Sequence, residues 1–197
     1  MDRPALFLDR DGVINIDYGY VSTIDKFEFI PGIFNLCRQA KQRGYLICVV
    51  TNQSGIGRGY YTEKDFFQLT DWMCSRFASE LAPVDKVYFC PTHPDHGIGK
   101  YKVESLFRKP APGMILQAVQ EFDIDLSRSV FVGDKQTDIQ AGVWAGVRYN
   151  LLYKDLLSSE VAWPCGCNGV NEFSVNSADS RTLTGIVSSL EQVIGFL

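Results

Sequence analysis

Short apolar runs alternate with helix-like segments along the first 150 residues. The runs have the length of buried strands and lie at residues 4–8, 45–50, 86–89, 129–132 and 147–152. Between them, apolar residues recur every three or four positions, which predicts amphipathic helices. Their apolar positions are Ile33, Leu36, Cys37 and Ala40, then Phe66, Leu69, Met73 and Phe77, then Ile115, Val119 and Phe122, and finally Ile139 and Val143.

Boundary residues support these elements. Gly44 and Gly146 follow two of the periodic segments, as is typical of helix ends. Thr62 and Asp65 have the spacing of a capping box at a helix start. Near the C-terminus a last helix is expected, and its apolar positions are Leu183, Ile186, Val187, Leu190 and Ile194.

The alternation of strands and helices predicts the fold class. We expect an α/β, Rossmann-like, doubly wound parallel sheet with helices on both faces. The chain of 197 residues fits a single domain, 1–197, with a core at about 5–150 and a C-terminal tail and helix at 151–197. Folds of this kind bind ligands beyond the carboxyl ends of their strands.

Composition narrows the classes of function. Hydrophobic residues make up 46% of the chain, and its net charge is −4 without a run of Lys or Arg, so a nucleic-acid partner is not expected. No apolar stretch approaches the roughly 18 residues of a membrane span, and no signal peptide is evident. We therefore expect a cytoplasmic protein, a monomer, whose six cysteines are free thiols.

Three polar clusters follow predicted strands. They are Asp9-Arg10-Asp11-Gly12, Thr51-Asn52-Gln53-Ser54-Gly55 and Gly133-Asp134-Lys135. Because the carboxyl ends of parallel strands share one edge of the sheet, these distant segments should converge on one site.

The pair Asp9 and Asp11 indicates a cation. Two carboxylates this close resist joint ionisation unless a positive charge lies between them, and Mg²⁺ prefers such oxygen ligands. Asp134 would supply a further oxygen. Taken alone, Asp-x-Asp-Gly is equally consistent with a simple turn after a strand.

Other residues could bind an anion. Thr51 offers a hydroxyl at a strand end, and Gly55, Gly57 and Gly59 would let the backbone approach a phosphate closely. Arg58 lies within this glycine-rich segment and could grip a second phosphate, although a solvated loop charge is the alternative.

Two further groups have ordinary alternatives. Arg108 and Lys109 are candidate phosphate donors or simply surface charges. Asp138 is explained equally well as a residue that complements the dipole at a helix start.

These motifs, in this order and spacing, resemble the four signature motifs of the haloacid-dehalogenase (HAD) superfamily of phosphohydrolases. The resemblance implies that Asp9 attacks phosphorus and forms an aspartyl-phosphate, and that Asp11 acts as general acid and then base. Thr51 and Lys109 would hold the phosphoryl group. Asp9, Asp134 and the backbone carbonyl of Asp11 would bind Mg²⁺.

Further motifs resemble the heptose bisphosphate phosphatase branch of the superfamily, of which histidinol phosphatases are near relatives. They include Asp17 to Val21, Thr51 to Ile56, Cys90-Pro91 and Arg108-Lys109-Pro110. The resemblance implies removal of the C7 phosphate of a heptose 1,7-bisphosphate, a lipopolysaccharide precursor. Histidinol phosphate or another small sugar phosphate is the alternative substrate, and a non-catalytic binding module is a third hypothesis. The implied substrate contacts are Asp17, Tyr18, Gly19, Tyr20, Asn52, Gln53, Ser54, Arg58, Arg108 and Lys135.

The chain departs from this branch at the loop that commonly holds a structural zinc. Cys90 fits the first ligand position, but Thr92, Ser105 and Phe107 occupy the other three. Since a closed zinc site needs four N or S ligands, we predict no structural Zn²⁺. Cys165 and Cys167 are expected to be ordinary thiols in the tail.

The intervals between motifs argue against a cap. Only 39 residues separate Asp11 from Thr51, and 57 separate Thr51 from Lys109. We therefore expect no separate cap domain and an open site.

Overall fold

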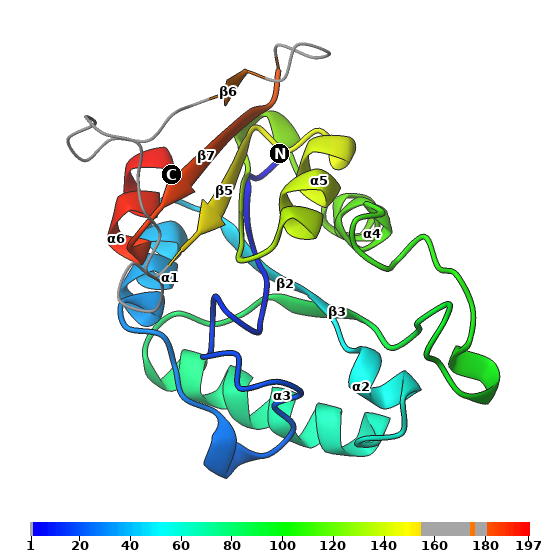
Figure 1. The fold of residues 1–197 in the computed structure, drawn as a ribbon. Helices are drawn as coiled ribbons and strands as arrows, with labels where there is room; N and C mark the ends of the chain where they lie inside the picture. Colours follow the sequence, from blue (N-terminus) through cyan, green and yellow to red (C-terminus); the bar gives the residue numbers. More distant parts are fainter. Residues whose placement is uncertain (1, 155–173, 176–180) are drawn as a thin grey trace, which may run out of the picture.

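A computed structural model describes residues 2–154, 174–175 and 181–197. Within these ranges the strands form one sheet in the order β3-β2-β1-β4-β5-β7-β6, shown in Figure 1. All neighbours pair in parallel except β6 and β7. The strands are β1 (Ala5–Leu8), β2 (Leu46–Asn52), β3 (Lys86–Cys90), β4 (Val130–Gly133), β5 (Tyr149–Tyr153), β6 (Ser174–Val175) and β7 (Leu183–Val187).

Helices cover both faces of this sheet, which confirms the expected α/β fold. Figure 1 shows α4 and α5 on one side and α1 and α6 on the other. The strand order runs outward from β1 in one direction and from β4 in the other, so the switch point lies between them. The helices are α1 (Ile33–Gln42), α2 (Ser54–Gly57), α3 (Glu63–Ser79), α4 (Gly113–Phe122), α5 (Gln136–Ala145) and α6 (Leu190–Val193).

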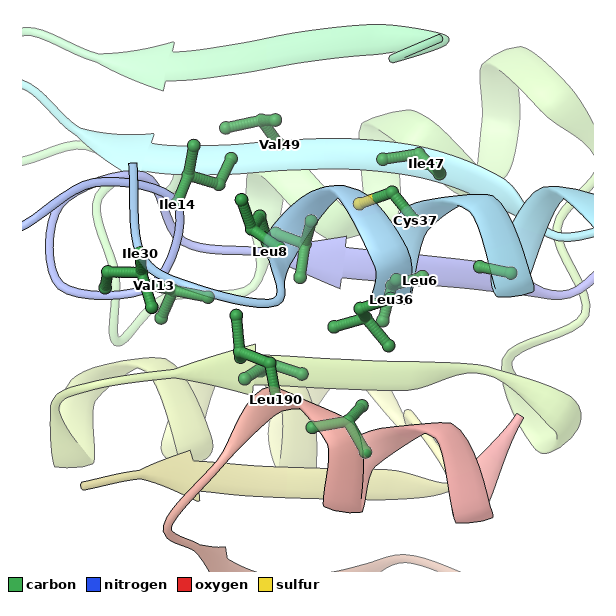
Figure 2. Packing of buried hydrophobic residues seen from close by; sticks show 14 of the residues in the cluster. Leu6, Leu8, Val13, Ile14, Ile30, Leu36, Cys37, Ile47, Val49 and Leu190 are labelled. Atoms are coloured by element: carbon green, nitrogen blue, oxygen red, sulfur yellow. The ribbon is translucent and has the colours of Figure 1, made fainter. Parts of the chain in front are cut away.

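Period-two alternation divides the side chains of the central strands between two hydrophobic cores. Leu6 and Leu8 of β1 enter the core shared with α1, α3 and α6, whereas Phe7 enters the core shared with α4 and α5. β2 alternates in the same way. Figure 2 shows Leu8 close to Leu36 of α1 and Leu190 of α6.

The predicted helix boundaries hold. The Thr62 hydroxyl accepts from the Asp65 backbone N–H at 3.2 Å, and the Asp65 carboxylate accepts from the Thr62 N–H at 2.8 Å. This confirms the capping box of α3. Gly44 follows α1 with φ +83°, a conformation that glycine adopts without strain.

The expected C-terminal helix is wrong over its first half. Residues 183–187 form β7, paired with β5, and only Leu190–Val193 is α-helical. Val187 is buried while Ile186 is 39% exposed, which is the alternation of a strand. The apolar spacing fitted a helix by coincidence, and pairing with the open edge of β5 decided the structure.

No cap domain occurs among the described residues. Between β1 and α1 the chain forms a loop with one 3-10 turn, Ile24–Lys26, and the loop after β3 has another, Gly99–Tyr101. No described helix is both long and apolar enough to cross a membrane. Cys165 and Cys167 lie outside the described residues.

Candidate active site

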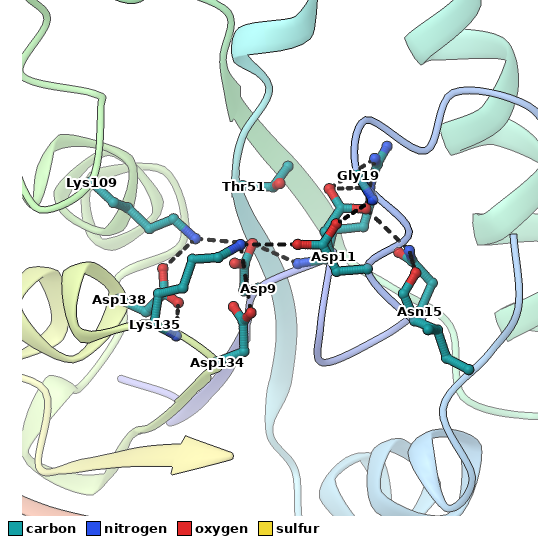
Figure 3. Close-up of polar contacts among 12 residues, drawn as sticks. Asp9, Asp11, Asn15, Gly19, Thr51, Lys109, Asp134, Lys135 and Asp138 are labelled. Carbon is teal, nitrogen blue, oxygen red and sulfur yellow. Dashed lines mark hydrogen bonds and ion pairs between the residues drawn. The ribbon is translucent and has the colours of Figure 1, made fainter. Parts of the chain in front are cut away.

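The three polar clusters meet at the carboxyl ends of adjacent strands, as expected. Asp9 directly follows β1, Thr51 lies near the end of β2 and Asp134 directly follows β4, and β1 lies between the other two. Figure 3 shows Lys109, which lies in the segment before α4, reaching into this group beside Asp9 and Asp138.

Lys109 is the central cation of the site. Its Nζ lies 2.9 Å from Asp9 Oδ1 and 2.8 Å from Asp138 Oδ1, and it donates to the Val50 carbonyl at 2.8 Å. An ammonium has three donors, so these partners satisfy all of them. Because Lys109 is 4% exposed, one buried positive charge faces two carboxylates.

The positive charges near the buried carboxylates of the site do not fully offset the cost of burying them. Burial raises the pKa of Asp9 to about 7; Lys109 opposes this rise, and Asp138 and Asp134 add to it. Burial also raises the pKa of Asp134. For Lys109, burial lowers the pKa, but the charges of Asp9 and Asp138 outweigh it and leave the pKa raised. A further cation would relieve this imbalance.

Three carboxylates could hold that cation. Oxygen atoms of Asp9, Asp134 and Asp138 lie within 4.8 Å of one another. Asp134 Oδ1 is buried and accepts no hydrogen bond from any described residue. A hard cation such as Mg²⁺ binds carboxylate oxygens of this kind, so the residues fit it.

Asp138 is a residue whose role the sequence understated. It does act at the helix start, because its Oδ2 accepts from the Lys135 backbone N–H at 3.0 Å. Its other oxygen binds Lys109 from inside the site, and the side chain is 1% exposed. Asp138 therefore caps the start of α5 and also pairs with Lys109.

The Asp11 carboxylate pairs with the guanidinium of Arg10. Arg10 Nη2 lies 2.9 Å from both oxygens of Asp11, and it also donates to the Val21 carbonyl at 2.7 Å. Asn15 Nδ2 donates to Asp11 at 3.1 Å and Gln53 Nε2 at 3.0 Å. Arg10 is 1% exposed, so this carboxylate is fixed by a buried guanidinium that no sequence pattern indicated.

Asn52 and Gln53, predicted to contact substrate, bond to protein groups. Asn52 donates to the Lys109 carbonyl at 3.1 Å and accepts from its N–H at 3.0 Å, so it clamps the lysine backbone. Gln53 Nε2 donates to Thr51 Oγ1 at 2.8 Å and to Asp11. Ser54 begins α2.

The glycine-rich loop expected at 55–59 contains a helical turn, because α2 reaches Gly57. Its first two glycines serve packing. A Cβ on Gly55 would lie 2.2 Å from Tyr61 Cε1, and one on Gly57 would lie 2.4 Å from the Pro91 carbonyl. Only Gly59 of these three has a positive φ, +76°. Close approach of an anion is therefore not what requires the first two.

Loop 17–20 and Lys135 border the site. Lys135 Nζ lies 3.1 Å from Asp17 and 3.5 Å from Asp134, and the Gly19 N–H donates to Asp17 at 3.0 Å. Figure 3 shows Lys135 in this group, where it pairs with Asp134. Tyr18 is 60% exposed, and its hydroxyl donates to Glu28 at 2.7 Å.

A second group of cations lies near Tyr20. The Arg58 guanidinium lies 5.9 Å from the Tyr20 ring centre, and its Nε is buried without a partner among the described residues. Arg108 donates to the Thr92 carbonyl at 3.1 Å. Burial lowers the pKa of Arg108, and the charge of Arg58 lowers it further. The two positive charges therefore repel each other.

The positions that replace zinc ligands have other partners. Cys90 Sγ lies 3.2 Å from Thr92 Oγ1, and Ser105 Oγ accepts from the Phe107 N–H at 3.1 Å. His93 Nδ1 accepts from two backbone N–H groups at 3.2 Å. The absence of structural zinc remains a prediction.

The fold and this site define a hydrolase of the HAD-like class, and comparison with known proteins agrees. A family model described as HAD-hydrolase-like matches residues 106–155. A putative HAD-like phosphatase from Mesorhizobium loti has a structure with TM-score 0.83 and 31% identity, covering 99% of this chain and 86% of that one.

Closer relatives narrow the class. The D-glycero-alpha-D-manno-heptose-1,7-bisphosphate 7-phosphatase of Burkholderia mallei is 65% identical over 82% of this chain and 86% of its own. The D-glycero-beta-D-manno-heptose-1,7-bisphosphate 7-phosphatase of Haemophilus influenzae is 49% identical over 76% of this chain and 81% of that protein. A B. bronchiseptica D,D-heptose 1,7-bisphosphate phosphatase, solved with magnesium and phosphate, has TM-score 0.68 and 32% identity, covering 76% and 80%. The chain belongs to this family of heptose-bisphosphate phosphatases and is a phosphatase.

Proposed function

We propose that the chain removes the C7 phosphate from D-glycero-D-manno-heptose 1,7-bisphosphate in a reaction that requires Mg²⁺. The observation that carries the proposal is the 65% identity to an enzyme named for that reaction, over 82% of this chain. The site supports the proposed chemistry, because Asp9, Lys109 and Asp134 meet at the carboxyl ends of β1 and β4, where the switch point lies.

Asp9 is the proposed nucleophile, attacking phosphorus to form an aspartyl-phosphate. Its Oδ1 accepts from Lys109 Nζ at 2.9 Å and from the Arg10 N–H at 2.7 Å, so the carboxylate has a fixed direction. A positioned carboxylate is a competent nucleophile once nearby cations offset its charge.

Mg²⁺ bound by Asp9 and Asp134, with the Asp11 backbone carbonyl, would neutralise phosphoryl charge. Two observations support this ligand set: the buried, unpartnered Asp134 Oδ1 and the clustering of the carboxylates within 4.8 Å. The proximity of Asp138 to the same group makes it a candidate further ligand.

The remaining residues hold the phosphoryl group and move the proton. Lys109 and the Thr51 hydroxyl would stabilise its equatorial oxygens. Asp11, held by Arg10, would protonate the leaving sugar oxygen and then take a proton from the water that hydrolyses the intermediate.

Arg58 and Arg108 would bind the second phosphate. Their charges repel each other across the loop beside Tyr20, and an anion between them would remove that repulsion. A bisphosphate supplies such an anion. Histidinol phosphate instead carries an ammonium group, which two guanidinium groups would disfavour.

A phosphate-release assay over both anomers of the heptose bisphosphate and histidinol phosphate, with and without Mg²⁺, tests the proposal. We expect Mg²⁺-dependent release from the heptose bisphosphate, with the α anomer preferred because the 65% identical relative acts on it. Phosphorus NMR should show that the product retains its C1 phosphate. Faster release from histidinol phosphate would overturn the substrate assignment.

A further inference from the structure

A chain of hydrogen bonds links Tyr61 to two residues of the proposed active site. The Tyr61 hydroxyl lies 2.5 Å from Gln53 Oε1. The other end of the same amide, Nε2, lies 2.8 Å from Thr51 Oγ1 and 3.0 Å from Asp11 Oδ2. Gln53 is 1% exposed and Tyr61 is 9% exposed, so the chain of bonds is buried.

Hydrogen-bond chemistry fixes the direction of each bond. Asp11 Oδ2 also accepts from Arg10 Nη2 at 2.9 Å, so this oxygen is an acceptor and the nitrogen of the Gln53 amide must face it. Its two protons then go to Asp11 and Thr51, and its oxygen accepts from Tyr61. Burial raises the pKa of Tyr61 to about 12, so its hydroxyl remains a donor at neutral pH.

The same geometry orients the Thr51 hydroxyl. Thr51 Oγ1 accepts from Gln53, so its own proton is free to be donated to a phosphoryl oxygen. Gln53 therefore acts on both a proton-transfer residue and an anion-binding residue of the proposed mechanism.

The ring of Tyr61 is fixed by its surroundings. It packs in a small buried cluster with Ile56 and Phe66. Gly55 leaves room for it, because a Cβ there would lie 2.2 Å from Tyr61 Cε1. The hydroxyl therefore has a fixed position from which to orient the amide.

We propose that Tyr61 is a positioning residue that acts through Gln53 to aim the Asp11 carboxylate and the Thr51 hydroxyl. The inference rests on the proposed function, since it takes Asp11 as the general acid. It also gives Gln53 a role in orienting its neighbours, beyond the substrate contact expected from the sequence.

The test is Tyr61→Phe, which removes the hydroxyl and keeps the ring. The matched control is Tyr88→Phe, because Tyr88 is also buried and donates to Glu121 at 2.8 Å, from β3. The melting temperatures of both variants should fall by similar small amounts. Only Tyr61→Phe should lower kcat/KM for the heptose bisphosphate, by about tenfold.

A second substrate separates positioning from a general structural effect. A sugar alkoxide needs a proton from Asp11 in order to leave, whereas the phenolate of 4-nitrophenyl phosphate leaves without one. Tyr61→Phe should therefore impair the sugar substrate more than the aryl substrate. Equal losses on both substrates would overturn the role through Asp11.

A double-variant comparison tests whether Tyr61 acts through Gln53, and it needs only the sugar substrate. Gln53→Met removes the amide and keeps the length of the side chain. If the action runs through Gln53, adding Tyr61→Phe to this variant should cost no further activity. Losses that multiply would overturn the proposal. A wild-type chain inactive on every phosphate ester would overturn the proposed function itself, whereas an active wild type matched by Tyr61→Phe would overturn only the positioning role.

Discussion

Lys109 Nζ lies 2.9 Å from Asp9 Oδ1, in an ion pair whose side chains are 3% and 8% exposed. The same nitrogen lies 2.8 Å from Asp138 Oδ1. Taking charges out of water is costly, so each partner of this group depends on the others.

Lys109→Met should be strongly destabilising and inactive. Removing the lysine leaves the carboxylates of Asp9 and Asp138 buried without their cation, which costs about 3–5 kcal/mol. Lys86→Met is the control, since Lys86 pairs with Glu121 at 2.7 Å on the surface. Denaturant unfolding without metal measures both. A Lys109 variant as stable as the Lys86 variant would contradict the buried pair.

Asp9→Asn should abolish turnover and change the pH dependence of stability. Burial raises the pKa of Asp9 from 3.8 to about 7 in the folded protein. The stability that this group contributes is therefore complete below its unfolded pKa and lost as the pH rises toward 7. Asparagine cannot ionise and escapes that loss.

Thermal unfolding in the presence of a chelator should show this difference. The melting temperature of Asp9→Asn relative to wild type should rise between about pH 4 and pH 7 and change little above that. A difference that does not change with pH would contradict the raised pKa of Asp9. Turnover near the wild-type rate would contradict its assignment as nucleophile.

Mg²⁺ should stabilise the wild type more at alkaline pH. Below about pH 7 a proton competes with the metal for Asp9, so the Mg²⁺-induced rise in melting temperature should be larger at about pH 8 than at about pH 6. Asp134→Asn should reduce this rise. Asp71→Asn, on the exposed side of α3, should not. An equal response of both variants would contradict the proposed ligand set.

The sequence predicted the fold and the meeting of strand ends, because both follow from local patterns. Asp9, Thr51 and Asp134 each lie at the end of a buried run. These side chains can meet only if the runs are neighbouring parallel strands. Contacts that depend on tertiary packing were not predictable in this way. Nothing in the pattern around Tyr61 indicates that its hydroxyl reaches Gln53, and nothing around Arg10 indicates that its guanidinium turns back onto Asp11.

The C-terminal error has a related cause. The segment Leu183 to Val187 is short enough to fit the apolar period of a helix or of a strand. What makes it a strand is its pairing with β5, which lies about thirty residues earlier in the chain. Asp138 was half predicted: its helix-start contact is local, whereas its bond to Lys109 is not.

Protein purified without chelators should contain no stoichiometric zinc, as measured by atomic absorption. Cys90 is the single residue left of the expected four ligands, and its sulfur contacts Thr92. The positive control is the variant with Thr92→His, Ser105→Cys and Phe107→Cys, which restores all four positions. One zinc per wild-type chain would contradict the prediction.

Gly12→Ala should inactivate the enzyme, and Gly44→Ala should not. Both glycines have positive φ, +91° and +83°, so alanine at either position costs about 1–2 kcal/mol of backbone strain. They differ in surroundings. A Cβ on Gly12 would lie 2.4 Å from Asp134 Oδ2, whereas one on Gly44 meets no described atom within 4 Å. Gly12→Ala must therefore displace the Asp134 carboxylate, and the Mg²⁺-induced rise in melting temperature should disappear along with turnover. Gly44→Ala should lose similar stability and keep both. If the two variants behave alike, then the close approach of Gly12 to Asp134 has no part in binding the metal.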